Sequence, residues 1–237
     1  MDFYISFLME NWWRFICVSI IAYLLGSINT AVMVTSVVTK GKKDIREMGS
    51  GNAGFTNVLR SVGVVPAVFT LLFDFLKGVI AGFAGKWIFS GIPTTDTVLL
   101  DELIIYGGFI GGVFAIIGHM YPVYFGFKGG KGIVTAASMM AVTDWRVFLL
   151  ILSTFLLIFV FSKIISLASI TCAGMYGVYT FIISYFVEYS YGVYPMRYVI
   201  ITSLLAFFLG TFVIVKHKDN IKRLLKGEEK KITAKKK

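Results

Sequence analysis

The sequence is poor in charged residues and has long stretches with none. Only 15% of its 237 residues are Asp, Glu, Lys or Arg, while 57% are hydrophobic. Soluble domains are usually about 25% charged and about 45–50% apolar. Apolar stretches of about 18 residues or more recur, and each could cross a hydrocarbon core roughly 30 Å thick. Because a soluble fold could not bury so much apolar surface, the composition predicts an integral membrane protein.

Cysteine is also scarce. Cys17 and Cys172 both lie in apolar segments, and no His lies near either in the sequence, so we expect neither a disulfide nor a metal pair. The N-terminus lacks the charged leader and the small-residue cleavage site of a secretory signal. We therefore expect the first apolar segment to stay in the mature protein.

The apolar segments predict an all-α polytopic membrane protein. They are 13–38, 62–90, 103–125, 132–144, 146–162, 167–187 and 197–215. Basic residues gather in 40–60, in 126–131 and in the C-terminal tail, whereas 91–102 contains acidic residues but no Lys or Arg. The positive-inside rule places the basic segments in the cytoplasm.

The number of crossings follows from parity. An even number must join 126–131 to the tail, and the last three apolar segments alone give an odd number. Accepting the short segment 132–144 as a span gives seven transmembrane helices, with the N-terminus outside and the C-terminus cytoplasmic. The alternative is five, with one broken crossing through 132–162 and the following segment partly in the interface. Residues 1–226 would form a single transmembrane catalytic domain, and 227–237 a disordered basic cytoplasmic tail.

Residues 44–60 form a polar, glycine-rich loop between apolar segments. Its Gly-x-Gly-x-x-Gly spacing matches the dinucleotide fingerprint, but a membrane helix stands where that fingerprint requires a strand, so we reject it. Accessible N–H groups beside guanidinium groups can bind a phosphate; the alternative is a flexible turn. The candidate ligands are Arg46, Ser50, Gly51, Asn52, Asn57 and Arg60.

A second loop places Lys128 and Lys131 on either side of Gly129 and Gly130. It is not a Walker A loop, because Gly132 stands where a Ser or Thr should hold magnesium. Two ammonium groups beside accessible N–H groups still make a compact anion site. The alternative is an ordinary basic loop that obeys the positive-inside rule.

Other polar residues are less specific. His217 and Asn220 would share a face of a continuing helix, although, taken alone, a solvated basic tail is the better explanation of this segment. Asp74 and Lys77 are expected to form a structural pair within a span. His119 lacks the acidic residue that the His-x4-Asp acyltransferase motif requires, because Tyr124 occupies that position.

Together these segments resemble the acyl-phosphate:glycerol-3-phosphate acyltransferase (PlsY) family of bacteria. The resemblance extends from residue 22 to the tail. It is carried by Ala22-Tyr23-Leu24-Leu25-Gly26-Ser27, the 44–60 loop, Asp74-x-x-Lys77-Gly78, Gly118-His119-x-x-Pro122 with 127–132, Ser166-Leu167-Ala168-Ser169, and His217-x-x-Asn220-Ile221-x-Arg223-Leu224. The departures are Asn29 in place of Pro, Phe55 in place of Ala, Lys163 in place of Arg, and a longer stretch around 186–197.

The resemblance implies a seven-helix fold with its site at the cytoplasmic face of the bacterial inner membrane. The reaction would transfer an acyl chain from acyl phosphate to the 1-hydroxyl of glycerol 3-phosphate, the first step of bacterial phospholipid synthesis. Lysophosphatidic acid and phosphate would be the products. The implied catalytic residues are Ser50, Arg60, Lys131, Ser166, His217 and Asn220. Substrate binding is expected from Arg46, Gly51, Asn52, Asn57, Lys128, Gly129 and Gly130.

The expected partners are glycerol 3-phosphate, acyl phosphate, membrane lipids and the enzyme that produces acyl phosphate. Neither a cofactor, a metal nor nucleic acid is expected. The alternative function is a membrane transporter or flippase for phosphorylated solutes or lipids. Transporters often show internal repeats and charges at the bilayer midplane, whereas this sequence shows no repeat and its polar motifs gather at one predicted face.

Overall fold

A computed structural model describes residues 2–232, and regular structure within them is entirely helical. Six of these helical segments are long and apolar enough to cross a membrane. They are Met9–Val38, Val64–Ser90, Thr97–Phe125, Trp145–Ser162, Ile165–Tyr189 and Met196–Lys216. The chain divides into two compact units, Met1–Thr143 and Asp144–Lys237, here called the first and second units.

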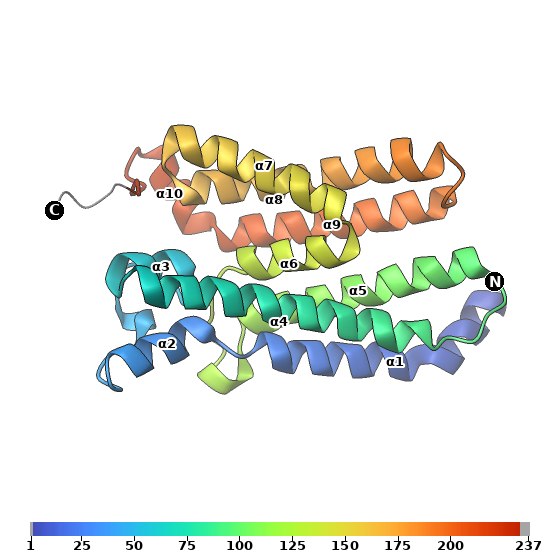
Figure 1. Ribbon diagram of the computed structural model, residues 1–237, viewed down its shortest axis with the longest axis horizontal. Coiled ribbons are helices and arrows are strands. Elements are labelled where there is room, and N and C mark those ends of the chain that lie inside the picture. The colour runs from blue at the N-terminus through green and yellow to red at the C-terminus, as the bar shows by residue number, and fades with distance from the viewer. Residues whose placement is uncertain (1, 233–237) are drawn as a thin grey trace. The chain divides into compact units, whose positions relative to one another are not determined.

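The first unit is built on three long helices that pack against one another: α1 (Asp2–Gly26), α4 (Val64–Ser90) and α5 (Thr97–Met120) (Figure 1). Close approach of α4 and α5 depends on Gly85 and Gly107, because a Cβ on either would collide with the other's carbonyl. Helix α6 (Ile133–Thr143) packs on both α4 and α5. Its 11 residues span only about 16 Å, so α6 is shorter than the expected crossing.

The predicted first span is two helices instead of one. After α1 the chain is extended at Asn29, whose side chain accepts a hydrogen bond of 3.2 Å from Val32 N and so caps α2 (Thr30–Val38). The buried Lys77 ammonium donates to the carbonyl of Ile28 at 2.8 Å. These contacts supply partners for backbone groups that a continuous helix would have paired internally. The break stands where the family resemblance leads one to expect proline.

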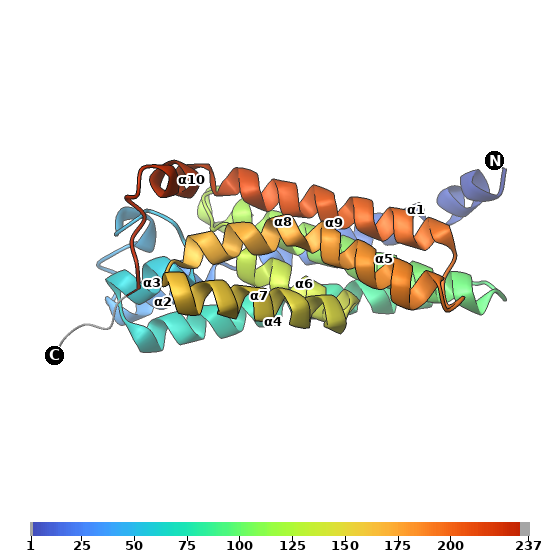
Figure 2. The same ribbon diagram turned by 90° about the horizontal axis from the view of Figure 1, so that it is seen from above.

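The second unit contains α7 (Trp145–Ser162), α8 (Ile165–Ile183), α9 (Met196–Lys216) and the short α10 (Lys218–Leu225). Helix α8 packs against both α7 and α9 (Figure 2). It continues into a π-helical turn, η3 (Ser184–Tyr189), at the start of the stretch that we expect to be long for the family. There Arg146 forms ion pairs with Asp144 and the buried Glu188.

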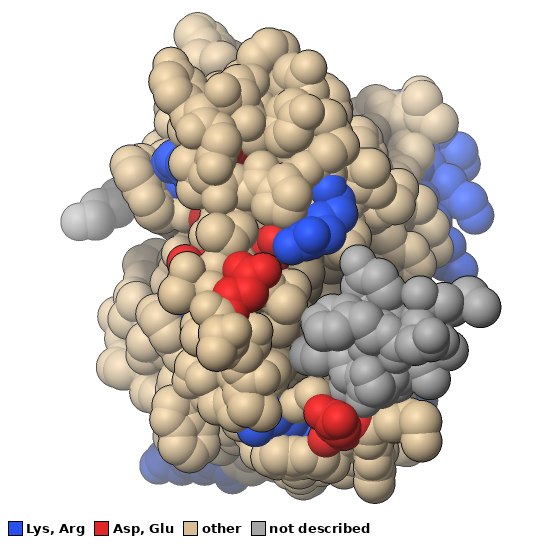
Figure 3. Space-filling model, turned by 90° about the vertical axis from the view of Figure 1, so that its right-hand side faces the viewer, with Lys and Arg blue, Asp and Glu red and all other residues tan. Residues whose placement is uncertain are grey.

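The surface supports residence in a membrane. Large apolar side chains are exposed on spanning helices of both units, including Trp87 at 78% and Phe161 at 81%. Most of the surface visible in Figure 3 is uncharged, with small groups of acidic and basic residues. Such surface is unfavourable in water and suited to hydrocarbon. The protein is therefore a multi-pass, helical membrane protein.

Candidate active site

Hydrogen bonds to the buried Asn57 side chain stabilise the conformation of the 44–60 loop. Asn57 lies in the short helix α3 (Phe55–Ser61) and is only 2% exposed. Its Nδ2 donates to the carbonyls of Ile45 and Met48 at 3.0 and 2.8 Å, and its Oδ1 accepts from Ser50 N at 3.0 Å. Since both amide hydrogens are used inside the loop, any contribution of Asn57 to substrate binding comes through the loop's shape.

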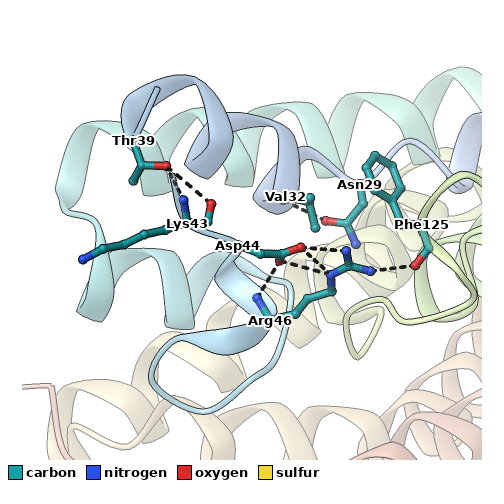
Figure 4. A network of polar contacts seen from close by, with 7 residues as sticks. All are labelled: Asn29, Val32, Thr39, Lys43, Asp44, Arg46 and Phe125. Carbon is teal, nitrogen blue, oxygen red and sulfur yellow. Dashed lines mark hydrogen bonds and ion pairs between the residues drawn. The ribbon is translucent and has the colours of Figure 1, made fainter. Parts of the chain in front are cut away.

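Arg46 ties this loop to the next one. It lies in the 3₁₀ turn η1 (Ile45–Glu47), which Asp44 caps. Its guanidinium pairs with Asp44 at 2.6 Å and donates to the carbonyl of Phe125 at 2.6 Å (Figure 4). The hydrogen bond from Arg46 lowers the pKa of the Asp44 carboxyl, and the same pairing raises the pKa of Arg46. Arg46 therefore joins two loops that the sequence separates by 79 residues.

The second glycine-rich loop lies against the first. Phe125 ends the turn η2 (Val123–Phe125) and packs on the apolar cluster that contains Ala53. A Cβ on Gly130 would collide with the Ala53 carbonyl and with the His119 ring. Gly130 N also donates to the His119 carbonyl at 3.1 Å. The two loops predicted separately to bind anions are thus brought together within the first unit.

A buried polar cluster supports this junction. The predicted pairing of Asp74 with Lys77 is confirmed, because the ammonium lies 2.8 Å from the carboxylate. Lys77 Nζ also lies 3.0 Å from His119 Nδ1. The same Nδ1 lies 3.6 Å from Asp74 Oδ1, and the Nε2 side of the ring is next to Gly130. In the sequence, His119 excluded one acyltransferase motif and supported the family resemblance, but nothing there indicated this buried contact.

The expected cationic and hydroxyl ligands of the first unit lie on or near these loops. Ser50 and Gly51 are exposed, Asn52 is half-buried, Arg60 is exposed in the last turn of α3, and Lys128 is exposed. Lys131 is half-buried at the end of the second loop. Backbone N–H groups and flexible cations beside one another can hold phosphate oxygens and a developing oxyanion.

The second unit supplies the remaining expected residues. Ser166 is buried in the first turn of α8, while His217 and Asn220 are buried where α9 passes into α10. His217 Nδ1 lies 2.8 Å from the carbonyl of Val213. Because a carbonyl can only accept, Nδ1 donates and the lone pair of the neutral ring is on Nε2. The imidazole thus has a fixed tautomer, which suits either phosphate binding or proton transfer.

One residue in this unit was missed. Glu229, which follows α10, accepts hydrogen bonds from Asn220 Nδ2 at 3.0 Å and from Arg223 Nε at 2.7 Å. The sequence placed it in a disordered tail, but the described part of that tail, 227–232, makes contacts within the second unit. Residues 233–237 lie outside the described chain.

Comparison with known proteins identifies the family. The family model of glycerol-3-phosphate acyltransferase matches residues 16–227. A glycerol-3-phosphate acyltransferase of Shewanella sediminis is 38% identical over 216 residues, which cover 91% of this chain and 93% of the relative. The corresponding protein of Shewanella oneidensis is 38% identical over 214 residues, with coverage of 90% and 91%.

This chain belongs to the glycerol-3-phosphate acyltransferase (PlsY) family.

Solved PlsY structures agree with this assignment. A crystal structure of PlsY described as an integral membrane glycerol 3-phosphate acyltransferase, in its glycerol 3-phosphate form, matches with a TM-score of 0.69 and 32% identity. The match covers 92% of this chain and 96% of that one. A second PlsY structure, in the lysophosphatidic acid form, matches with a TM-score of 0.67 at the same identity. The family resemblance seen in the sequence is thus confirmed over nearly the whole chain.

Proposed function

We propose that this protein transfers an acyl chain from an acyl phosphate to the 1-hydroxyl of glycerol 3-phosphate, giving lysophosphatidic acid and phosphate. The meeting of two glycine-rich loops that carry Arg60, Lys128 and Lys131 supports this reaction most directly. Relatives of this chain are named glycerol-3-phosphate acyltransferases, and PlsY structures exist in glycerol 3-phosphate and lysophosphatidic acid forms. The protein is accordingly an acyltransferase.

The chemistry asks mainly for electrostatic stabilisation. An acyl phosphate is a mixed anhydride and is already activated. The acceptor hydroxyl attacks the carbonyl carbon, a new ester C–O bond forms, the C–O bond to phosphate breaks, and the hydroxyl proton leaves with the phosphate. Two anions must be held together while an oxyanion develops, which calls for cations and N–H donors more than for a nucleophile.

The residues divide by role. Arg60, Lys128 and Lys131 neutralise phosphate charge, and Ser50 with the N–H groups near Gly51 and Asn52 donates to the oxyanion. Gly129 and Gly130 let the second loop lie directly against His119 and Ala53. Arg46 and Asn57 act through the shape of the first loop, as their internal hydrogen bonds indicate. Ser166, His217 and Asn220 of the second unit act in the same reaction, with His217 binding phosphate.

The proposal includes the topology. We infer seven crossings with α6 as a short one, the N-terminus outside, and the site at the cytoplasmic face of the bacterial inner membrane. The parity of the basic segments supports this. In sealed vesicles of known orientation, a Glu228→Cys thiol should react with a charged maleimide only from the cytoplasmic side, and a Thr95→Cys thiol only from outside. Labelling of both from one side would contradict the topology.

The donor is tested by supplying purified protein with glycerol 3-phosphate and either palmitoyl phosphate or palmitoyl-CoA. We expect lysophosphatidic acid only from the acyl phosphate. Product from the thioester alone would keep the acceptor and overturn the donor. The enzyme that produces acyl phosphate is the expected partner for delivery of this unstable, lipid-soluble substrate.

A further inference from the structure

The chain after α10 folds back within the second unit. Gly227 adopts φ +70°, and its N–H donates to the Leu224 carbonyl at 3.0 Å, which ends the helix. A left-handed glycine with such a bond is a common helix C-terminus. Further on, Ile232 N donates to the carbonyl of Lys163 at 2.8 Å, in the turn between α7 and α8. The segment between these bonds, which contains Glu229, is therefore held at both ends.

Glu229 has its carboxylate enclosed by polar partners. Its side chain is only 5% exposed, although its ion-pair partner Arg223 is 38% exposed. One oxygen accepts from Asn220 Nδ2 and the other from Arg223 Nε. Burial acts to raise the pKa of Glu229, but Arg223, the neighbouring Ser166 hydroxyl and Asn220 outweigh it, and the pKa is lower than usual. The group is thus a carboxylate at neutral pH.

A carboxylate here determines which way the Asn220 amide faces. An asparagine side chain has two orientations of nearly equal shape, which exchange Oδ1 and Nδ2. An ionised carboxylate only accepts hydrogen bonds, so it excludes the orientation that would turn Oδ1 toward it. Asn220 Oδ1 is therefore directed away from Glu229, as an acceptor.

We propose that Glu229 is a positioning residue for acyl transfer, which holds the Asn220 amide in a single orientation and keeps Arg223 beside it. This rests on the proposed function, in which Asn220 takes part in the reaction. A glutamine at position 229 that kept its oxygen on the Arg223 Nε donor would turn its NH2 group toward Asn220, and this would favour the reversed orientation of Asn220. Acyl transfer would then be confined to the small fraction of molecules in which Asn220 keeps its native orientation.

The alternative is that Glu229 imitates a substrate phosphate and inhibits the enzyme. The structure favours positioning, because leaving the site would break the ion pair with Arg223, remove the acceptor of the Asn220 amide and require breaking a bond at one end of the segment. An inhibitory carboxylate would have to make that movement in every catalytic cycle. Removing it should then raise activity, which the experiment below would detect.

The test compares Glu229→Gln with Glu228→Gln in the full-length protein. The two residues are adjacent, but Glu228 is exposed. With palmitoyl phosphate and glycerol 3-phosphate, we expect kcat of Glu229→Gln to fall about tenfold to a hundredfold, the effect of losing a hydrogen bond to a charged group. Glu228→Gln should match the wild type. Equal or higher activity in Glu229→Gln would overturn the proposal, and a gain with a lower KM for glycerol 3-phosphate would indicate inhibition.

A mutant cycle separates positioning from a general structural effect. In an Asn220→Ala background, Glu229→Gln should change kcat by less than about twofold, because the side chain that it orients is gone. A full additional loss would mean that Glu229 acts independently of Asn220, and would overturn the proposal. Full activity of Asn220→Ala would overturn it too. Failure of the proposed function is visible separately, as absence of lysophosphatidic acid from the wild type.

A second test exchanges the chemical groups at positions 220 and 229, and it applies even if Glu229→Gln alone folds poorly. Asn220→Asp alone places two carboxylates against each other, and we expect little activity. Combining it with Glu229→Gln restores one donor and one acceptor with their positions reversed, and should raise kcat at least about tenfold above Asn220→Asp. No recovery in protein whose unfolding temperature is restored would contradict the proposed role.

Discussion

The two units present their candidate residues in different ways. In the first unit, the loops at 44–60 and 126–132 are shaped by backbone hydrogen bonds to Asn57 and by left-handed glycines, and the cations lie at their edges. In the second unit, Ser166, His217 and Asn220 are buried side chains at helix ends. There the backbone is helical at Ser166 and Asn220 and forms a turn at His217, and the contacts of each side chain set its orientation.

This difference predicts how substitutions in each unit will affect activity. A change in the path of the first loop moves several donors together, so distant substitutions that touch Asn57 should act like substitutions in the site. In the second unit, each side chain is oriented by one or two partners, such as Val213 for His217 and Glu229 for Asn220. Substitutions there should have local effects that a mutant cycle can resolve.

The largest effect is expected for removal of a cation from the first unit. Lys131→Ala should lower kcat/KM about a hundredfold to a thousandfold, because the transition state would lose a half-buried cation that neutralises phosphate charge. Lys128→Ala should cost less, because Lys128 is exposed and solvent weakens its interaction with an anion. Steady-state kinetics with palmitoyl phosphate measure both. Equal losses of kcat/KM would show that the difference in burial does not determine how much each lysine contributes to catalysis.

Alanine substitutions at two glycines test whether the backbone path of the first loop determines activity. Gly49 and Gly41 have similar φ values of +57° and +75°, but a Cβ on Gly49 would collide with Asn57 and Ser61, whereas a Cβ on Gly41 meets nothing within 4 Å. Both Ala variants carry about 1 kcal/mol of backbone strain, and only Gly49→Ala adds about 1–3 kcal/mol of overpacking. In detergent, Gly49→Ala should therefore have a lower unfolding temperature than Gly41→Ala. Activity should be lost chiefly in Gly49→Ala.

If the two alanine variants unfold alike and retain equal activity, Asn57 does not determine the loop's path. The comparison between the units would then lose its main support.

A smaller effect is expected for His217 in the second unit. If it binds phosphate, His217→Ala should raise KM about tenfold, the cost of losing one hydrogen bond to a charged group. The pH profile of kcat should keep its shape, because the proton leaves with the phosphate. Loss of a limb near neutral pH together with a collapse of kcat would instead identify His217 as a general base.

The smallest effect concerns pH and the Asp44–Arg46 contact. The pKa of Asp44 is lowered in the folded protein, so its contribution to stability is present above the unfolded value of about 3.9 and is lost as pH falls through the folded value. The unfolding temperatures of the wild type and Asp44→Asn should differ by a constant amount between about pH 5 and 8. The difference should shrink below about pH 4. Glu47→Gln, exposed in the same turn, serves as the control.

Much of the fold could be predicted from apolar length alone. The predicted spans 62–90, 146–162 and 197–215 lie within two residues of α4, α7 and α9, because lipid-facing helices must be continuously apolar. The break at Asn29 could not be read in this way, since its cause is a side chain that caps the next helix. Helix α5 begins earlier than predicted because Asp96 caps it, with a 3.0 Å bond from Leu99 N.

The candidate site was harder to read. Chemistry identified both loops, but not that Arg46 joins them through the Phe125 carbonyl, because backbone partners far along the chain leave no trace in composition. Asn57 looked like a ligand since an amide serves equally well as a scaffold. Glu229 lies in a segment rich in Lys and Glu that indicates a solvated tail, and only the fold-back after Gly227 brings it to Asn220 and Arg223.

Phosphate release from palmitoyl phosphate, measured with and without glycerol 3-phosphate alongside lysophosphatidic acid, tests direct acyl transfer most simply. The account predicts that release requires glycerol 3-phosphate and equals lysophosphatidic acid mole for mole. Release without the acceptor, together with acylation of Ser50, would contradict direct transfer.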